Sequence, residues 1–388
     1  MTWQRKITSG VLLMAAIAAS TLDSVTAQQP SPPLLEQVRA AWVRREHAVK
    51  TLRVSWESKR TTPKGVFTGS MPHLDKSKPA TPAPPQDTVH KGTGQLLLDG
   101  IKARFTNEEP VFNGSTGVFV PNRTESTFDE SVFSQLILRE DGIPQMTINT
   151  EKRNRDGWRV EISPVLTAVR GLNPDLVPDH LGHFTQARSV AAAGRPLVEL
   201  TRPRDETRGE QKLWVDPAAD FSTVRVEQFD REGRLSSRLT ATPGRGPSGI
   251  WLPERWTFTK VKPDGKLYTQ VEVTVQTCEV GVATSAADFQ LVPPVGTRVY
   301  DTSGPTPRES ITREGRPDRV ILPSEKGNPN DLLAQTETGD LAPKTPISPW
   351  TWVVIVAGSM ITLGSLGLLV RSRRRRTPAS VPLTGEVP

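Results

Sequence analysis

The sequence of 388 residues contains one cysteine, Cys278, and few aromatic residues (6%, with two tyrosines). A lone cysteine cannot form an internal disulfide, so a hydrophobic core must stabilise the fold. Cys278 lies in the strand-like run Val271 to Val280, which favours a small buried side chain over a reactive thiol. Long apolar runs are also scarce, and the two that are free of charge lie near the two ends of the sequence.

The first apolar run has the features of a secretory signal. Arg5 and Lys6 give a positive start, Val11 to Ala18 is too short to span a bilayer, and Val25-Thr26-Ala27 is a small-residue cleavage pattern. The sequence therefore predicts a signal peptide over residues 1–27. The alternative is an uncleaved N-terminal anchor.

The second apolar run, Trp350 to Val370, contains 21 residues without a charge. As a helix it would be about 30 Å long, which is the thickness of a hydrocarbon core. Five arginines follow it: Arg371, Arg373, Arg374, Arg375 and Arg376. By the positive-inside rule these arginines predict a cytoplasmic tail over residues 371–388. We therefore expect a transmembrane helix over 350–370, the membrane as a partner, and single-pass insertion in the inner membrane of a bacterium with the N-terminal domain outside.

The net charge of +7 does not indicate nucleic-acid binding. Arg5, Lys6 and Asp23 leave +1 in residues 1–27, and the five tail arginines against Glu386 leave +4 in residues 350–388. The remaining +2 is spread along the rest of the chain without a basic block. The basicity belongs mainly to the tail, so no nucleic-acid partner is expected.

The region after residue 27 opens with a change of period. Apolar residues from Leu34 to Val49 recur at helical spacing, which predicts an amphipathic helix. Leu52, Val54 and Trp56 then alternate with polar residues, which is typical of a strand with one buried face. Residues 61–91 are rich in proline, serine and threonine, and we interpret them as a flexible insertion between two strands.

The remaining pattern is dominated by strands. Short turns such as Pro263-Asp264-Gly265 separate strand-like runs from residue 197 to 280, which indicates an antiparallel meander. Residues 132–139 and 163–171 are interpreted as short helices. The predicted fold is α+β and β-dominated: a large curved antiparallel sheet, or incomplete barrel, with the N-terminal helix packed on it, plus one transmembrane helix. Residues 28–302 are expected to form one domain, and residues 303–349 a disordered stalk.

Three short motifs give the chain a resemblance to a known family. They are Leu213-Trp214-Val215-Asp216, Gly249-Ile250-Trp251-Leu252-Pro253, and Asp288-Phe289-Gln290-Leu291 with the segment from Pro294 to Asp301. In their order and spacing they resemble the LolA, LolB and RseB proteins, the periplasmic lipoprotein-carrier fold. The likeness covers about residues 34–60 and 92–301. A C-terminal membrane segment departs from LolA, which is soluble, and from LolB, which is lipid-anchored.

The resemblance implies an apolar cavity on the concave face of the sheet that takes acyl chains. Six aromatic residues are the candidates to line it, with ordinary core packing as the alternative: Trp42, Trp56, Trp214, Trp251, Trp256 and Phe258.

Motifs for chemistry are absent from the sequence. His180 and His183 are a close pair, but no third ligand is suggested nearby, so we expect a loop with two exposed histidines and no metal site. No serine lies in a GxSxG setting and no phosphate-binding loop is present. The expectation is therefore a binding protein, not an enzyme, without a cofactor. The alternative is a hydrolase that these motifs do not reveal.

The sequence thus favours a membrane-tethered module outside the cytoplasm that binds a hydrophobic ligand, such as a lipid or a lipoprotein acyl chain. The alternative is an RseB-like envelope sensor or scaffold that acts through a protein partner.

Overall fold

The structure, a computed structural model, describes residues 33–66, 84–113, 116–140, 142–150, 161–177, 179–192, 194–246 and 249–321. All of them belong to one compact unit, Met1–Lys326. The α-helices of this part of the chain are α2 (Leu34–Ala48) and α3 (Ser163–Arg170), and 3-10 turns span Leu181–His183, Pro217–Ala219 and Ala286–Phe289.

Strands make up most of the described residues. The strands that form one large sheet are β1 (Thr51–Thr62), β2 (Thr88–Asp99), β3 (Lys102–Glu108), β6 (Asn122–Asp129), β7 (Val132–Arg139), β8 (Gln145–Asn149), β9 (Gln186–Ala192), β10 (Arg195–Arg202), β11 (Gln211–Asp216), β12 (Ser222–Phe229), β13 (Leu235–Arg245), β14 (Trp251–Val261), β15 (Leu267–Val280), β16 (Arg298–Asp301), β17 (Arg308–Ile311) and β18 (Arg319–Val320). A separate small hairpin consists of β4 (Val111–Asn113) and β5 (Val118–Val120).

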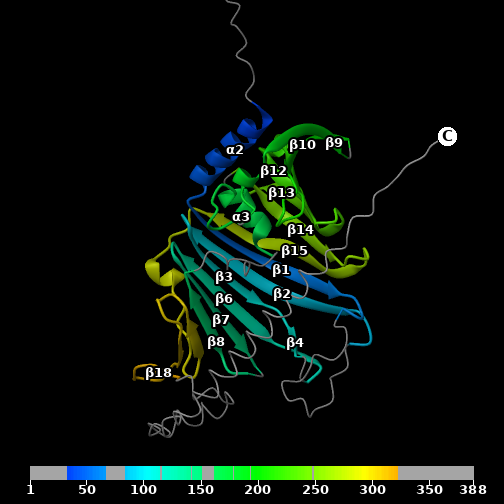
Figure 1. The fold of residues 1–388 in the computed structure, drawn as a ribbon. Coiled ribbons are helices and arrows are strands. Elements are labelled where there is room, and N and C mark those ends of the chain that lie inside the picture. Colours follow the sequence, from blue (N-terminus) through cyan, green and yellow to red (C-terminus); the bar gives the residue numbers. More distant parts are fainter. Residues whose placement is uncertain are drawn as a thin grey trace, which may run out of the picture. The chain divides into compact units, whose positions relative to one another are not determined.

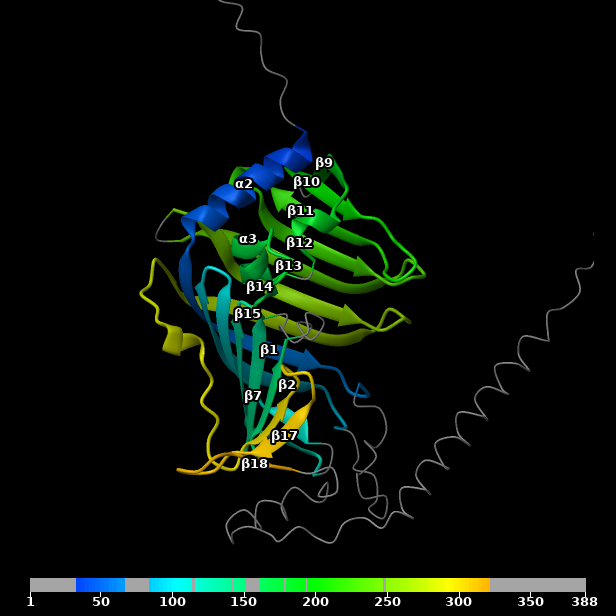
Figure 2. The same cartoon turned by 60° about the vertical axis from the view of Figure 1, so that its left-hand side comes forward.

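The order of strands in the large sheet places the first and last long strands at its centre. It runs β18-β17-β16-β8-β7-β6-β3-β2-β1-β15-β14-β13-β12-β11-β10-β9, so β1 pairs with β2 on one side and with β15 on the other. Neighbours are antiparallel except β8 and β16, which are parallel. Figures 1 and 2 show this sheet curling around α3, with α2 across the β9–β12 end.

The core lies on the face of the sheet that carries α3, which we call the inner face. Period-two alternation places Leu52, Val54 and Trp56 of β1 on this face, and they pack with Val165 and Leu166 of α3 in the main apolar cluster. A second cluster joins α2 to β10 and β11, with Val38, Ala41 and Trp42 against strand residues such as Leu200 and Leu213.

The structure confirms that the fold is β-dominated and built on one large sheet. Within the described residues this sheet does not close into a barrel. The predicted helix over 34–49 is α2, and residues 163–170 are the helix α3. Residues 61–91 connect β1 to β2, although both strands extend into that range, because Thr62 pairs with Thr88.

Two predictions need correction. Residues 132–139 form the strand β7 rather than a helix, because β6 on one side and β8 on the other supply strand partners that outweigh local preference. The sheet also continues into β17 and β18, past residue 302 where the stalk was expected to begin. Residues 322–349, the rest of the expected stalk, lie outside the described residues, as does most of the insertion (67–83).

The membrane prediction is corrected as well. Searching the part of the chain that the structure describes reveals no helix with the length and apolar character needed to cross a bilayer. Single-pass insertion in the inner membrane is therefore not supported, and neither is a transmembrane helix as part of the fold. The segments behind those predictions, 1–27 and 350–388 with Arg371 and Arg373 to Arg376, lie outside the described residues.

Candidate functional site

Two openings in the sheet occur where neighbouring strands diverge. At the first, the pairing of β14 with β15 ends at Arg255 and Thr274, and the earlier residues of β14 pair only with β13. We call the gap the β14–β15 opening. It holds a cavity of about 450 Å³. Its size falls in the range of small-molecule sites.

The inner walls of the β14–β15 opening are apolar and its rim is charged. Five side chains form the inner walls: Val54, Val165, Leu252, Val275 and Cys278. Val54, Val165 and Leu252 are buried members of the main cluster, contributed by β1, α3 and β14. Arg245, Glu254 and Arg255 line the same cavity and are exposed. A ligand with an apolar body and a polar end fits this division.

Cys278 is the one titratable group on the inner walls of this opening. The pKa of its thiol is raised above the ordinary 9.0, mainly because burial removes the group from water and to a smaller extent because of the negative charge of Glu279. The thiol is therefore protonated at neutral pH and acts there as an apolar wall residue.

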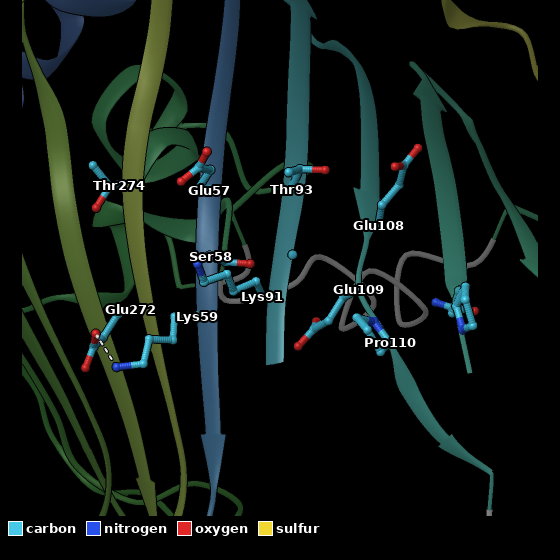
Figure 3. A pocket seen from close by; sticks show the side chains of 13 residues that line it. Glu57, Ser58, Lys59, Lys91, Thr93, Glu108, Glu109, Pro110, Glu272 and Thr274 are labelled. Carbon is cyan, nitrogen blue, oxygen red and sulfur yellow. Dashed lines mark ion pairs between the residues drawn. The ribbon is translucent and has the colours of Figure 1, made fainter. Parts of the chain in front are cut away.

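At the second opening, the pairing of β2 with β3 ends at Thr93 and Glu108. We call this gap the β2–β3 opening, and it holds a cavity of about 560 Å³. Figure 3 shows its lining, to which four neighbouring strands contribute charged side chains: Glu272 of β15, Glu57 and Lys59 of β1, Lys91 of β2 and Glu108 of β3. Lys59 and Glu272 form an ion pair there, 3.8 Å from Nζ to Oε2. Gly92 lies in the same lining, where its neighbours approach closely, because an added Cβ atom would be 2.9 Å from both the Glu108 carbonyl oxygen and Ser58 Oγ.

A buried ion cluster adjoins the β2–β3 opening. The guanidinium of Arg60 donates to both oxygens of Glu109, with Nη2 3.1 Å from Oε2, and to Glu161 Oε1 at 2.5 Å. Both carboxylates are buried, with side chains 5% and 1% exposed. Burial opposes the charge of Arg60, but the hydrogen bonds and charges of the two glutamates outweigh it and raise the pKa of the guanidinium. This cluster holds strand ends together and is not poised to transfer protons.

A row of inner-face residues crosses the strands between the two openings. Val275 of β15 pairs with Trp56 of β1, Trp56 with Gly94 of β2, and Gly94 with Asn107 of β3. Trp56 and Asn107 are buried, yet Trp56 Nε1 and both amide atoms of Asn107 have no hydrogen-bond partner. Buried polar atoms are rarely left unpaired, so such a row is a candidate ligand contact.

The six predicted cavity residues lie in different surroundings. Trp42 belongs to the α2 cluster and donates from Nε1 to the Phe221 carbonyl at 2.9 Å. Trp56 and Trp256 are buried in the main cluster, and Phe258 packs against it. Trp214 and Trp251 each stack under an arginine, Arg225 and Arg245. Val275, of the β14–β15 opening, neighbours Trp56 across the strands, but none of the six lines either opening, and their role as ligand contacts stays a prediction.

Sequence reasoning missed the residues that line the openings. It also missed Asn107 and Arg60, which lie near the openings in ordinary strand patterns. Strand pairing places Asn107 across Gly94 from Trp56, and a side-chain hydrogen bond joins Arg60 to Glu109. His180 and His183, expected to be exposed, are half-buried, with ring centroids 4.2 Å apart. Among the described residues no cluster of His, Cys, Asp and Glu could hold a metal.

Comparison with known proteins yields no family model and no curated protein that matches the chain. Solved structures match at low similarity. A domain assigned to an outer membrane lipoprotein-sorting protein of Vibrio parahaemolyticus is 14% identical, with a TM-score of 0.40 over 66% of this chain and 95% of that one. A DUF1329 family protein of Desulfovibrio piger is 13% identical, with a TM-score of 0.40 over 66% and 97%.

A LolA superfamily protein of Nitrosomonas europaea is 12% identical, with a TM-score of 0.36 over 66% of this chain and 97% of that one. The structural neighbours are therefore LolA-superfamily and DUF1329 proteins, the first of which the sequence motifs also resemble. These TM-scores are too low to support a functional argument, which has to rest on the openings themselves.

Proposed function

We propose that the protein is a binding module for an amphiphilic ligand, a lipid or an acylated molecule, whose acyl chain enters the β14–β15 opening. The observation that carries the proposal is the division of that cavity into apolar inner walls and a charged rim.

The energetics favour a chain-like apolar ligand. Burial of each CH₂ group against side chains such as Val54, Leu252 and Val275 contributes about 0.8 kcal/mol, so about ten methylene groups correspond to micromolar affinity before the cost of association is subtracted. A wholly polar ligand would lose its own hydration against these apolar side chains without forming hydrogen bonds to them. The rim arginines, Arg245 and Arg255, supply positive charge at the mouth, which suits an anionic head group.

The test is binding of a fluorescent fatty acid to the full chain, followed by its displacement with palmitate. Cys278→Phe places a larger side chain on the inner wall and is expected to weaken binding at least tenfold. Val292→Phe makes a similar change at a position that is 85% exposed and away from both openings, and is expected to bind as the wild type does.

The rim gives a second arm to the same experiment. Arg255→Met is expected to weaken palmitate several-fold while leaving a neutral acyl alcohol unaffected, because only the charged head group loses a partner. Wild-type protein that binds neither probe would contradict the proposal, and so would Cys278→Phe protein that binds both normally.

A second candidate function, recognition of a protein partner, is favoured by the edge of β2. The pairing of β2 with β3 ends at Thr93, so from Thr88 to Gly92 the strand is paired with β1 alone. Extended peptides add to such edges through main-chain hydrogen bonds. Hydrogen exchange separates the two functions: a peptide partner would slow exchange over residues 88–92, whereas an acyl ligand would slow it over residues 274–278.

A further inference from the structure

Three buried polar atoms on the inner face have no partner. They are Nε1 of Trp56 and the Nδ2 and Oδ1 atoms of Asn107. Trp56 is 1% exposed and Asn107 is 0% exposed, so bulk water does not serve them. Each unpaired buried group costs about 1–3 kcal/mol, a cost that an apolar residue of the same shape would avoid.

The register brings these atoms to one place. Trp56 and Asn107 lie on opposite sides of Gly94 and on the same face, because Gly94 pairs with both. The indole of Trp56 lies directly over Gly94, where an added Cβ atom would be 2.6 Å from Nε1. Phe105 holds the indole there by stacking, with an interplanar angle of 10°. The indole nitrogen therefore lies over Gly94, whose neighbour on the other strand is Asn107.

The donors and the acceptor in this row define the chemistry of a ligand group. Trp56 offers one N–H donor, while the amide of Asn107 offers donors at Nδ2 and an acceptor at Oδ1. A donor from each of the two side chains suits a carbonyl oxygen, and the acceptor of Asn107 suits an amide N–H or a hydroxyl. A hydrocarbon or an ether provides no acceptor of this strength.

We propose that Trp56 and Asn107 bind the carbonyl group that links an acyl chain to its head group, and that the ligands are acyl esters or acyl amides. The inference rests on the proposed function, since it assigns a contact to the same amphiphile. Val275 connects the two regions, because it lines the β14–β15 opening and pairs with Trp56 on the inner face.

Trp42 provides a comparison, because it is a buried tryptophan whose N–H has a hydrogen-bond partner. It is as deeply buried as Trp56, at 2% exposed, but its Nε1 donates to the Phe221 carbonyl at 2.9 Å. Trp56 has the same burial without such a partner. The difference is expected if the N–H of Trp56 is kept for a ligand.

The experiment compares two ligands of equal chain length, monopalmitoylglycerol and its ether analogue hexadecylglycerol, which differ by the carbonyl oxygen. The full-length wild-type protein is expected to bind the ester about five- to tenfold more tightly. Trp56→Phe and Asn107→Leu are expected to bind both ligands equally. Trp42→Phe, the matched control, is expected to keep the preference for the ester.

The unfolding temperature of the ligand-free protein gives an independent readout. Asn107→Leu removes two unpaired polar atoms and is expected to raise the midpoint by about 2–4 °C, whereas Trp42→Phe loses a formed hydrogen bond and lowers it. A variant that loses the ester preference while gaining stability cannot be dismissed as misfolded.

The outcomes are distinguishable. Equal binding of ester and ether by the wild type overturns the inference, assigns the row to ordered water, and leaves the proposed function standing. A preference that persists in both Trp56→Phe and Asn107→Leu also overturns it. If the wild type binds neither ligand, the proposed function fails and this inference fails with it.

Discussion

The two openings are alike in origin and opposite in chemistry. Both arise where paired strands separate: the residues of β14 before Arg255 do not pair with β15, and the residues of β2 before Thr93 do not pair with β3. The β14–β15 opening reaches apolar side chains that α3 helps to supply, and its charges lie at the exposed rim. The lining of the β2–β3 opening also carries exposed charges, such as the Lys59–Glu272 pair, but beside it Arg60 joins two buried carboxylates, Glu109 and Glu161.

The contrast separates stability from binding. Rim arginines such as Arg255 are solvated, so removing one changes the free energy of unfolding little. Arg60 cannot be removed at so low a cost, because it compensates two carboxylates that are away from water. The rim arginines of the β14–β15 opening are therefore available to a ligand, whereas the Arg60 cluster beside the β2–β3 opening holds the fold.

Arg60→Met should give the largest effect. It withdraws the guanidinium from the buried carboxylates of Glu109 and Glu161, and a loss of about 3–5 kcal/mol in the free energy of unfolding is expected. Arg255→Met, the counterpart at the other rim, should lose less than about 0.5 kcal/mol. Urea denaturation of the two variants measures the difference. Similar losses would show that the two openings do not differ as described.

Glycine substitutions probe the packing beside each opening. At Gly94 an added Cβ would collide with the indole of Trp56, so Gly94→Ala should destabilise the fold by about 1–3 kcal/mol. At Gly246, in the turn between β13 and β14, the nearest atom to an added Cβ is the Ile250 carbonyl oxygen at 3.5 Å.

Gly246→Ala is therefore tolerated, with a change within about 0.5 kcal/mol. Thermal unfolding distinguishes the pair. A neutral Gly94→Ala would mean that the indole has room to move, and would remove the fixed position of its N–H.

A smaller effect is expected from His90, which lies near Arg60 and Glu109 and makes the stability of the folded state depend on pH. Desolvation by burial is the largest cause that lowers the pKa of His90 below the ordinary 6.5, and the charge of Glu109 opposes it. As the pH falls through 6.5, the unfolded chain takes up a proton that the folded protein resists, so the folded state loses stability.

The urea midpoint is therefore expected to fall between pH 7.5 and 5.5, and to fall less in His90→Gln. His180 and His183, whose pKa values burial also lowers, should leave a residual slope in that variant. A wild-type midpoint that is flat over this range would contradict the assignment.

Period and turn chemistry were enough to predict the strands from residue 197 to 280 and the helix α2, because those signals are local. They were not enough for β7, whose strand form depends on partners on both sides. The openings could not be predicted, because a sequence gives no sign of where two strands cease to pair. Trp56 was predicted as a ligand contact, but Asn107, which we propose acts with it, was found only through the strand register at Gly94.

The smallest perturbation is chemical labelling of the Cys278 thiol, which lies on the inner wall of the β14–β15 opening. Because it is the chain's one cysteine, a thiol reagent reports on that wall alone. Burial raises its pKa, so labelling should be slow at pH 7.5 and should still accelerate as the pH passes 9.0, where an ordinary thiol levels off. Palmitate bound in the opening should slow labelling at least fivefold, whereas a peptide bound along β2 should not. Fast labelling that no acyl ligand slows would mean that the wall is open to water, and the two openings would no longer differ in what they admit.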